Sequence, residues 1–97
     1  MKLAKNDIDF LRKFFSDKPV KKAFLFGSFA RADAAEDSDI DILVELDYSH
    51  HIGLGFIKMK LEIEDALQKK IDLASDQAVS KELLPFINKD KQLIYER

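Results

Sequence analysis

The segment Asp39–Leu46, with the sequence DIDILVEL, limits the folds open to this 97-residue chain more than any other stretch. Alternate side chains of a β-strand point to opposite faces. On that spacing four aliphatic side chains share one face: Ile40, Ile42, Val44 and Leu46. Asp39 and Asp41 would share the other face with Leu43. The segment therefore predicts a strand that buries one face and carries two carboxylates on the other.

The two aspartates of this strand need a counter-charge. Alternate strand residues lie about 6.6 Å apart along the backbone, so the carboxylates of Asp39 and Asp41 can converge on one point above the sheet. Two carboxylates ~4 Å apart repel each other by several kcal/mol at the effective dielectric of a protein surface. A shared proton, a lysine or arginine, or a divalent cation would offset this repulsion. Mg²⁺ suits such a site, because it takes one or two carboxylates and completes its shell with water and phosphate oxygens.

The sequence before this strand predicts a helix and a first strand. Asn6 can cap a helix that runs to about Ser16, because apolar residues recur there at helical spacing. Pro19 ends the helical segment, and the run VKKAFLF predicts a strand over Val20–Phe26. Residues 28–32 have room for only a short helical turn, which a polar loop follows.

The sequence after Leu46 predicts two more helices and two short strands. The longest helix should run from Ile52 to about Lys69, with a core-facing stripe at helical spacing: Ile52, Phe56, Met59, Ile63 and Ala66. A short strand over Lys70–Leu73 follows. A brief helix around Leu83–Asn88 is interrupted by Pro85, and Gln92–Glu96 is a candidate closing strand.

These elements add up to one α/β (α+β) domain over residues 1–97, with a small mixed β-sheet of three or four strands packed with helices. The net charge of −2, with acids and bases interspersed, argues against direct nucleic-acid binding, which normally uses a basic face. Cysteine is absent, so neither disulfides nor thiolate metal sites can form. The first residues lack the apolar run of a signal peptide, and no segment approaches membrane-spanning length, so we expect a cytoplasmic protein.

A break at Gly27 and Ser28 provides the candidate phosphate site. Glycine permits a close backbone approach, and Ser28 can cap a helical turn whose N–H groups hold an anion. Arg31, one turn later, is a suitable phosphate partner. Asp72, between two aliphatic residues of another short strand, is a candidate third acid.

Each of these features also has a purely structural explanation. Gly-Ser is a common turn, Asp39 can cap the turn after Ser38, Asp72 can face water from an edge strand, and Arg31 can be a surface charge. The ordered combination of strand, Gly-Ser, acid-x-acid strand and a later strand acid is much more specific. We interpret His50-His51 as an exposed loop before the long helix, and the apolar stripe of that helix as core. Phe29 can either pack under the turn or lie exposed beside a ligand.

The stretch GSFARADAAEDSDIDILVE resembles the signature of the DNA polymerase beta-like nucleotidyltransferases, in particular the minimal nucleotidyltransferase (MNT) group. The resemblance extends from about Val20 to Arg97 through KKIDLAS and ELLPFINKDKQLIYER. It implies a nucleotidyltransferase fold in which Gly27 and Ser28 hold the nucleotide phosphates. By the same resemblance, Asp39 and Asp41 bind Mg²⁺, and Asp72 is the third acid, as base or metal ligand.

The resemblance also implies a function. MNT proteins are often antitoxins paired with a HEPN-domain ribonuclease toxin, and some adenylylate that toxin. We therefore expect Mg²⁺-dependent transfer of a nucleoside monophosphate, AMP from ATP, to a hydroxyl of a HEPN-type partner protein. The alternative is a non-catalytic antitoxin that neutralises its partner sterically. A third hypothesis, modification of an aminoglycoside-like small molecule, is weaker, because such enzymes carry an added helical domain for the acceptor.

One residue departs from the family pattern. The family commonly has glycine after the arginine of the motif, whereas Ala32 follows Arg31 here. Alanine disfavours positive φ, so we expect the loop after Arg31 to follow a different course.

Overall fold

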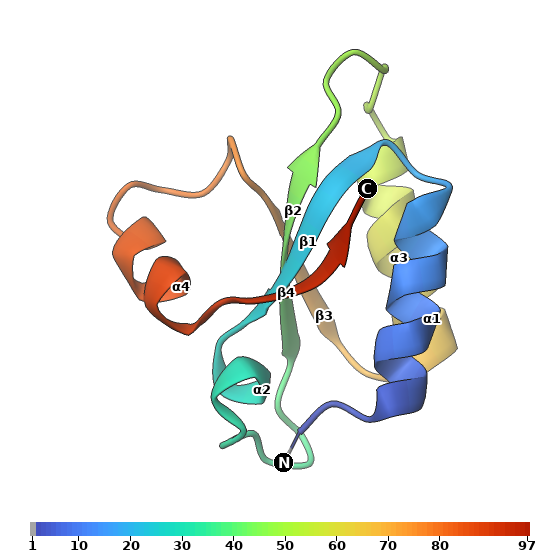
Figure 1. The fold of residues 1–97 in the computed structure, drawn as a ribbon. Helices are drawn as coiled ribbons and strands as arrows, with labels where there is room; N and C mark the ends of the chain where they lie inside the picture. The colour runs from blue at the N-terminus through green and yellow to red at the C-terminus, as the bar shows by residue number, and fades with distance from the viewer. Residues whose placement is uncertain (1) are drawn as a thin grey trace.

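A four-stranded β-sheet organises the fold in the computed structural model, which describes residues 2–97 of the chain. Its strands are β1 (Val20–Phe26), β2 (Ile40–Leu46), β3 (Ile71–Ser75) and β4 (Gln92–Glu96). They lie side by side in the order β3-β2-β1-β4 (Figure 1). β1 is antiparallel to β2 and to β4, whereas β2 and β3 run parallel. The sheet is therefore mixed, and the fold class expected from the sequence is confirmed.

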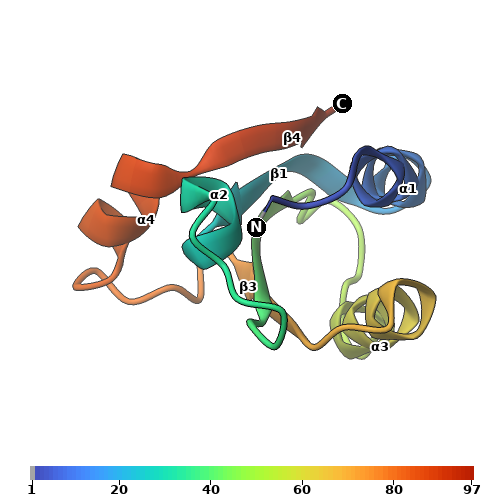
Figure 2. The same cartoon turned by 90° about the horizontal axis from the view of Figure 1, so that it is seen from below.

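The helices lie on both sides of this sheet. Within residues 2–97 they are α1 (Lys5–Ser16), α2 (Ser28–Arg31), α3 (Gly55–Leu67) and α4 (Leu84–Asp90). Figures 1 and 2 show the two long helices, α1 and α3, along one side, and the short helix α4 on the other. The single turn of α2 follows directly on the end of β1 (Figure 2). One face of the sheet is thus covered by the two long helices and the other by the short helix α4, while Phe29 and Ala30 of α2 pack into the main core.

The main hydrophobic core fills the space between the sheet and the two long helices. Leu11 and Phe15 of α1 are buried in it, together with Met59 and Ile63 of α3. The alternating aliphatic residues of β2 all belong to this core, as predicted: Ile40, Ile42, Val44 and Leu46. Burial of one such side chain contributes ~1.5–3 kcal/mol, and a shift of one residue would turn all four to the other face. The core therefore fixes which face of β2 its aspartates occupy.

A smaller hydrophobic cluster lies on the opposite face. It joins Phe24 of β1, Leu43 of β2 and Ile87 of α4, each of which is buried. Phe24 and Leu43 are direct partners in the antiparallel register of β1 and β2. This cluster attaches α4 to the face of the sheet that also carries the acidic side chain of Asp41.

Several predicted boundaries are confirmed and others are wrong. The strands predicted at Val20–Phe26 and Gln92–Glu96 have these bounds in the structure. β2 begins at Ile40, so Asp39 lies just before the strand and not within it. The third strand begins at Ile71 and continues to Ser75, two residues beyond the predicted end.

The helix boundaries needed more correction. Asn6 does not cap α1: the helix begins at Lys5, and its N-cap, Ala4, makes no side-chain capping hydrogen bond. α3 begins at Gly55 and not at Ile52. Pro85 does not interrupt α4 but lies in its first turn, where the missing N–H of proline leaves no hydrogen bond unmade.

One predicted core position of α3 is exposed, and the helices are too short or too polar to span a membrane within residues 2–97. Ala66, predicted on the core-facing stripe of α3, is exposed, because the stripe continues from Ile63 to Leu67, which packs partly buried against the main core. Across residues 2–97, none of the helices combines the length and the apolar character that a membrane span needs.

Candidate active site

Asp41 lies in a row of three residues that crosses the sheet. In the strand register its partner on β1 is Phe26, and its partner on β3 is Asp72. The neighbours of Asp41 along β2, Ile40 and Ile42, are buried in the main core, so its side chain lies on the opposite face. Because residues paired across a parallel register point the same way, Asp41 and Asp72 are on one face, as predicted.

Negative charge is concentrated around Asp41. Burial and, after it, the negative charges of Asp72 and Asp39 together raise the pKa of Asp41 from its ordinary value of 3.8 to about 6. Asp41 and Asp72 are direct partners in the register of β2 and β3, which places both carboxyls at the same level of the sheet. Arg31 acts in the opposite sense and lowers this pKa. The site therefore holds negative charge that the described side chains only partly offset.

Gly27 is required by the position of Asp41. Its φ of 73° and ψ of −153° belong to a region that essentially only glycine adopts. A Cβ atom at this position would overlap Oδ2 of Asp41 and lie 3.1 Å from its Cγ. The sequence predicted a close backbone approach at Gly27, and in the structure the approaching group is the Asp41 carboxyl.

Ser28 and Arg31 begin and end the single turn of α2. The N-cap of α2 is Gly27, so the predicted cap by Ser28 is wrong, and the carbonyl oxygen of Ser28 accepts a hydrogen bond from the N–H of Asp33 at 3.0 Å. Arg31 donates from Nε to Asp33 at 3.1 Å and from Nη1 to Asp90 at 3.0 Å. These two acceptors raise the pKa of the guanidinium, so Arg31 is a stable positive charge at this point.

The backbone conformation of Ala32 determines the course of the loop after Arg31. It adopts the left-handed conformation itself, with φ 64° and ψ 23°, at the C-cap of α2. The expectation that alanine would send the loop on another course is wrong in this respect. Alanine takes the conformation that glycine adopts more easily, at an energetic cost of roughly 1 kcal/mol.

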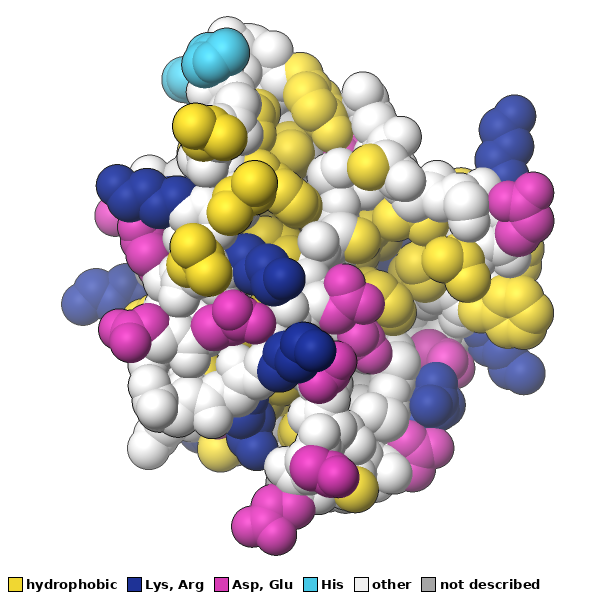
Figure 3. Space-filling model, turned by 180° about the vertical axis from the view of Figure 1, so that it is seen from behind, with side chains coloured by type: hydrophobic (Ala, Val, Ile, Leu, Met, Phe, Trp, Pro, Cys, Tyr) yellow, Lys and Arg dark blue, Asp and Glu magenta, His cyan; other side chains and the backbone are white. Residues whose placement is uncertain are grey.

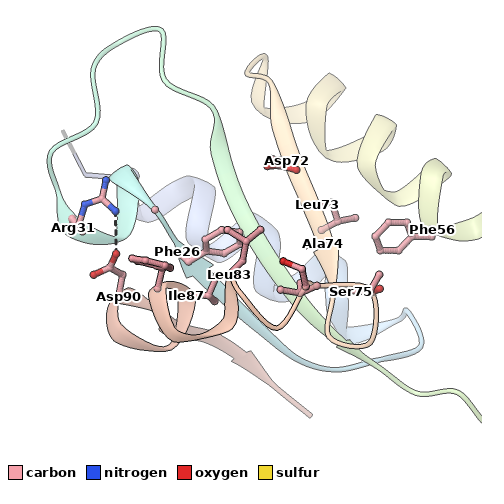
Figure 4. Close-up of a pocket in the computed structure, with 15 residues that line it drawn as sticks. Phe26, Arg31, Phe56, Asp72, Leu73, Ala74, Ser75, Leu83, Ile87 and Asp90 are labelled. Atoms are coloured by element: carbon pink, nitrogen blue, oxygen red, sulfur yellow. Dashed lines mark hydrogen bonds and ion pairs between the residues drawn. The ribbon is translucent and has the colours of Figure 1, made fainter.

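A cavity of about 590 Å³ opens between α4 and the face of the sheet that carries Asp72. Gly27, Arg31 and Asp72 of the predicted site line it, together with Asp90. Figure 4 shows Arg31 and Asp90 on one side, joined by a hydrogen bond, and Asp72 on the other. Most other lining residues are apolar, among them Phe26, Leu73, Leu83 and Ile87. A ligand with a charged end and an apolar end matches this lining.

The face around the cavity carries exposed apolar side chains on both flanks. On α4 and just before it, Phe86 and Leu83 are 69% and 56% exposed. On and before α3 the exposed residues are Leu54, Ile57 and Leu61. Figure 3 shows hydrophobic side chains gathered toward both edges of this face, with acidic and basic side chains between them. Exposed apolar patches of this kind commonly occur at protein–protein contacts.

The donor chemistry of the acidic pair fits a hard divalent cation. Oxygen-only ligands are those that Mg²⁺ uses, and a cation would offset the repulsion that raises the pKa of Asp41. Within the described part of the chain, no three His, Cys, Asp or Glu side chains are already gathered as a metal-binding group. Asp39 is exposed and precedes β2, while its charge still acts on Asp41. The structure thus brings Asp41 and Asp72 together and places Asp39 at their edge.

Sequence reasoning missed Asp90 and Gln92. Both come from the C-terminal segment, where the sequence offered only a mixed-charge helix and a strand. Asp90 binds Arg31, and Gln92 Nε2 donates to the carbonyl of Ala30 in α2 at 3.0 Å. No local sequence pattern indicates such contacts, because the partners are 59 and 62 residues apart in the sequence.

The remaining predictions for single residues are settled by burial. Phe29 packs under the turn and is only 3% exposed, so it is a core residue. His50 and His51 are exposed in the loop before α3, as predicted. Nε2 of His50 lies 3.7 Å from Oδ2 of Asp47.

Comparison with known protein families identifies one that covers nearly the whole chain. The model of the polymerase beta nucleotidyltransferase domain matches residues 8–97. A Methanocaldococcus jannaschii protein described as a candidate protein adenylyltransferase is 34% identical over 88 residues, which cover 87% of this chain and 85% of that protein. The protein adenylyltransferase MntA of Thermococcus cleftensis is 39% identical over 54 residues, which cover 56% of this chain and 54% of that one.

Solved structures share the fold. A candidate minimal nucleotidyltransferase superposes with a TM-score of 0.78 at 24% identity, covering 91% of this chain and 89% of that one. A chain of a toxin–antitoxin complex crystallised with AMP-PNP has the same TM-score at 22% identity and covers 98% of this chain and 75% of its own. A chain from a complex of the tri-AMPylated HEPN toxin of Shewanella oneidensis with its MNT antitoxin has a TM-score of 0.74 at 18% identity, covering 96% and 72%.

Proposed function

We propose, from the premise that this chain belongs to the polymerase beta nucleotidyltransferase family, that it transfers AMP from ATP to a hydroxyl group of a partner protein. The family match over residues 8–97 makes the chain a nucleotidyltransferase. ATP as the nucleotide, Mg²⁺ as the metal and a protein as the acceptor are our proposals. We further propose that the acceptor is a HEPN-type toxin and that this chain is its antitoxin.

The observation that carries this proposal is the pairing of Asp41 with Asp72 across β2 and β3, beside Gly27. Two carboxyls lie in register on adjacent strands, next to a glycine that no residue with a side chain can replace. This arrangement is energetically unfavourable. Stability alone does not account for it, because the neighbouring charges and burial oppose ionisation of Asp41. A bound cation, together with phosphate oxygens, would offset the repulsion between the two carboxylates and so account for the arrangement.

Asp39 and Asp41 would hold the Mg²⁺ ion, and Asp72 beside them would act as the base or as a further metal ligand. When bound, this ion supplies positive charge that neutralises the triphosphate and stabilises the departing pyrophosphate. Gly27 and Ser28 would place backbone N–H groups against the phosphates, and Arg31 would add a fixed positive charge at the cavity. Arg31 and Gly27 line the same cavity as Asp72, which supports this division of roles.

The transfer itself needs a base at the acceptor hydroxyl. The hydroxyl oxygen attacks the α-phosphorus of ATP, the bond from that phosphorus to the bridging oxygen of the β-phosphate breaks, and pyrophosphate leaves. Asp72 would accept the proton of the hydroxyl, since its carboxyl lies at the cavity and beside the metal-binding pair. The apolar lining around it would exclude water from the reacting groups.

A protein acceptor is supported by the surface and by the relatives. Exposed apolar side chains flank the cavity, among them Phe86 and Leu83. Relatives are described as protein adenylyltransferases, and chains of similar fold occur in toxin–antitoxin complexes. A docked protein would also supply the proximity that raises the rate of a two-substrate reaction.

The test is transfer of labelled AMP to a defined acceptor. The chain is mixed with a HEPN-domain protein, ATP labelled at the α-phosphate, and Mg²⁺. We expect the label on the HEPN protein and a mass increase of one or more AMP groups, with a tyrosine as the modified residue. The matched control is the variant Asp39→Asn/Asp41→Asn, which should bind the partner but transfer no label.

Steric neutralisation is the competing outcome. The wild type would then inhibit the ribonuclease without any mass increase, and the Asp39→Asn/Asp41→Asn variant would inhibit it equally well. That result would leave a binding module in place of a protein adenylyltransferase.

A further inference from the structure

A carboxylate from the C-terminal segment holds Arg31 at the cavity. Oδ2 of Asp90 accepts a hydrogen bond from Nη1 of Arg31 at 3.0 Å (Figure 4). The Asp90 side chain is 21% exposed, whereas that of Asp33, which binds Nε of the same arginine, is 59% exposed. Arg31 and Asp90 both line the cavity that also contains Asp72. The orientation of the guanidinium is therefore set mainly by the better-buried partner, Asp90.

A second contact joins the same two regions. Gln92, at the start of β4, donates from Nε2 to the carbonyl oxygen of Ala30 in α2 at 3.0 Å. α2 is only one turn long, so its own hydrogen bonds give it little rigidity. The turn that carries Arg31 is thus attached to the α4–β4 segment at two points, one through a side chain and one through its backbone.

Asp90 is poorly placed for the stability of α4. It is the last residue of that helix, where the partial negative charge of the helix end disfavours a carboxylate. The preceding residue, Lys89, is of the type that such a position favours. Since the local structure gives no reason for an acid at this position, its contact with Arg31 explains it better.

We propose that Asp90 is a positioning residue that holds the guanidinium of Arg31 in the orientation that binds the phosphates of the nucleotide. The inference rests on the proposed function, in which Arg31 contacts those phosphates. An arginine has five N–H donors in a planar group, so contacts with Asp33 and Asp90 leave other donors for a phosphate. A side chain that is already ordered loses less conformational freedom when the ligand binds, and the affinity is higher for that reason.

The sign of the effect separates positioning from simple charge repulsion. If Asp90 only repelled the anionic nucleotide, its removal would strengthen binding. If Asp90 orients Arg31, its removal weakens binding although a negative charge has gone. The dissociation constant of Mg²⁺-ATP for Asp90→Ala, measured by calorimetric titration, should rise on the order of ten-fold, as is typical when a supporting contact is lost.

Two further variants test whether the effect passes through Arg31. Asp90→Asn should give an intermediate affinity, because the amide oxygen can still accept a hydrogen bond from Nη1. In an Arg31→Ala background, Asp90→Ala should cause no additional loss, since there is no guanidinium left to orient. An equal loss in both backgrounds would overturn the inference.

Asp47 provides the matched control. It forms the same kind of ion pair, with Arg97 at 2.7 Å, and its side chain is 15% exposed, but neither residue lines the cavity. Asp47→Ala should leave the affinity for Mg²⁺-ATP unchanged. A wild-type protein that binds no Mg²⁺-ATP would overturn the ATP-dependent function and this inference together. Wild-type binding with equal or tighter binding by Asp90→Ala would overturn the inference alone.

Discussion

Asp41 on β2 and Asp72 on β3 are direct partners in the parallel register, and burial together with the negative charge of Asp72 raises the pKa of Asp41. The aliphatic neighbours of both residues are buried in the main core, so neither strand can turn its acid away without exposing that core. The fold thus holds two carboxyls together by packing on the other side of the sheet. Their repulsion is opposed mainly by the packing of the core and only in part by the positive charge of Arg31.

Removal of the Asp41 charge should stabilise the nucleotide-free protein at neutral pH. The folded-state pKa of about 6 exceeds the ordinary value of 3.8, so between these values the folded state binds more protons than the unfolded state. Stability therefore falls as the pH rises through this range, and the loss is complete above about pH 6. The two pKa values correspond to at most ~3 kcal/mol, and the partial exposure of the carboxyl reduces the expected gain for Asp41→Asn to about 1 kcal/mol. Thermal unfolding of the wild type and Asp41→Asn near pH 7.5 measures this gain in stability.

The same experiment at low pH is its internal control. Near pH 4 Asp41 is neutral in the folded protein, so the difference between the wild type and Asp41→Asn should almost vanish. Asp65→Asn, at an exposed position of α3, provides the comparison for a general change of charge. Equal effects of the two substitutions at both pH values would show that the proximity of Asp72 does not matter.

Mg²⁺ and ATP together should raise the melting temperature through the acidic residues. A ligand at a hundred times its dissociation constant adds ~2.7 kcal/mol of stability, which is roughly 10 °C for a domain of this size. Asp39→Asn/Asp41→Asn should abolish this shift while leaving the fold intact. Because protons compete with the metal for Asp41, the wild-type shift should also shrink as the pH falls below about 6. An undiminished shift in the double variant would show that these acids do not hold the metal.

Asp72→Asn should separate binding from chemistry. The amide keeps the shape of the side chain, so the cavity and the partner complex should form, and Mg²⁺-ATP should still raise the melting temperature. The transfer of AMP should fall by roughly 10²–10⁴-fold, the usual contribution of a positioned base. Single-turnover transfer to the partner protein measures the loss. If Asp72→Asn instead loses the thermal shift as fully as the Asp39→Asn/Asp41→Asn variant, Asp72 acts mainly as a metal ligand.

The central strands could be predicted because their patterns are local. The alternation in β2 and the apolar run of β1 place each side chain on one face without reference to the rest of the chain. Helix ends were harder, because Ala4 and Leu54 precede α1 and α3 without any side-chain cap. Tertiary packing, and not the terminal residues, decides where those helices begin.

The site was predictable as far as its acids and its glycine. Asp41, Asp72 and Gly27 belong to short motifs, and their proximity follows from strand order. The contacts of Arg31 with Asp90 and of Ala30 with Gln92 could not be predicted, because they join segments about sixty residues apart. Such contacts depend on where α4 packs against the sheet. No residue spacing in the sequence predicts that position.

Ala32→Gly should stabilise the protein. Ala32 holds a left-handed conformation with φ 64°, which glycine adopts without steric cost. The gain should be about 0.5–1 kcal/mol, since the relief of strain exceeds the added freedom of the unfolded chain. Ala66→Gly, at an exposed helical position of α3, should instead destabilise by about 1 kcal/mol. Chemical denaturation measures both, and a loss of stability in both variants would contradict the strain at Ala32.

Gly27→Ala should destabilise the protein by about 3 kcal/mol or more. The backbone at Gly27 has a conformation that alanine adopts only with strain, and the added Cβ would overlap Oδ2 of Asp41. Gly55→Ala is the matched control, because a Cβ there meets nothing within 4 Å. At the start of α3 this substitution should be neutral or stabilise by about 0.5 kcal/mol. Thermal unfolding should therefore separate the two glycines by more than 10 °C.

A second substitution distinguishes the steric overlap from the backbone strain. In Gly27→Ala/Asp41→Ala the carboxyl that meets the new methyl group is gone, and the nearest remaining Asp41 atom, Cβ, lies at an ordinary contact distance of 3.5 Å. The double variant should recover part of the stability lost by Gly27→Ala, and the cost of the positive φ should remain. Full additivity of the two substitutions would mean that Gly27 is needed only for its backbone conformation. Partial recovery would establish that this glycine is there to admit the carboxyl of Asp41.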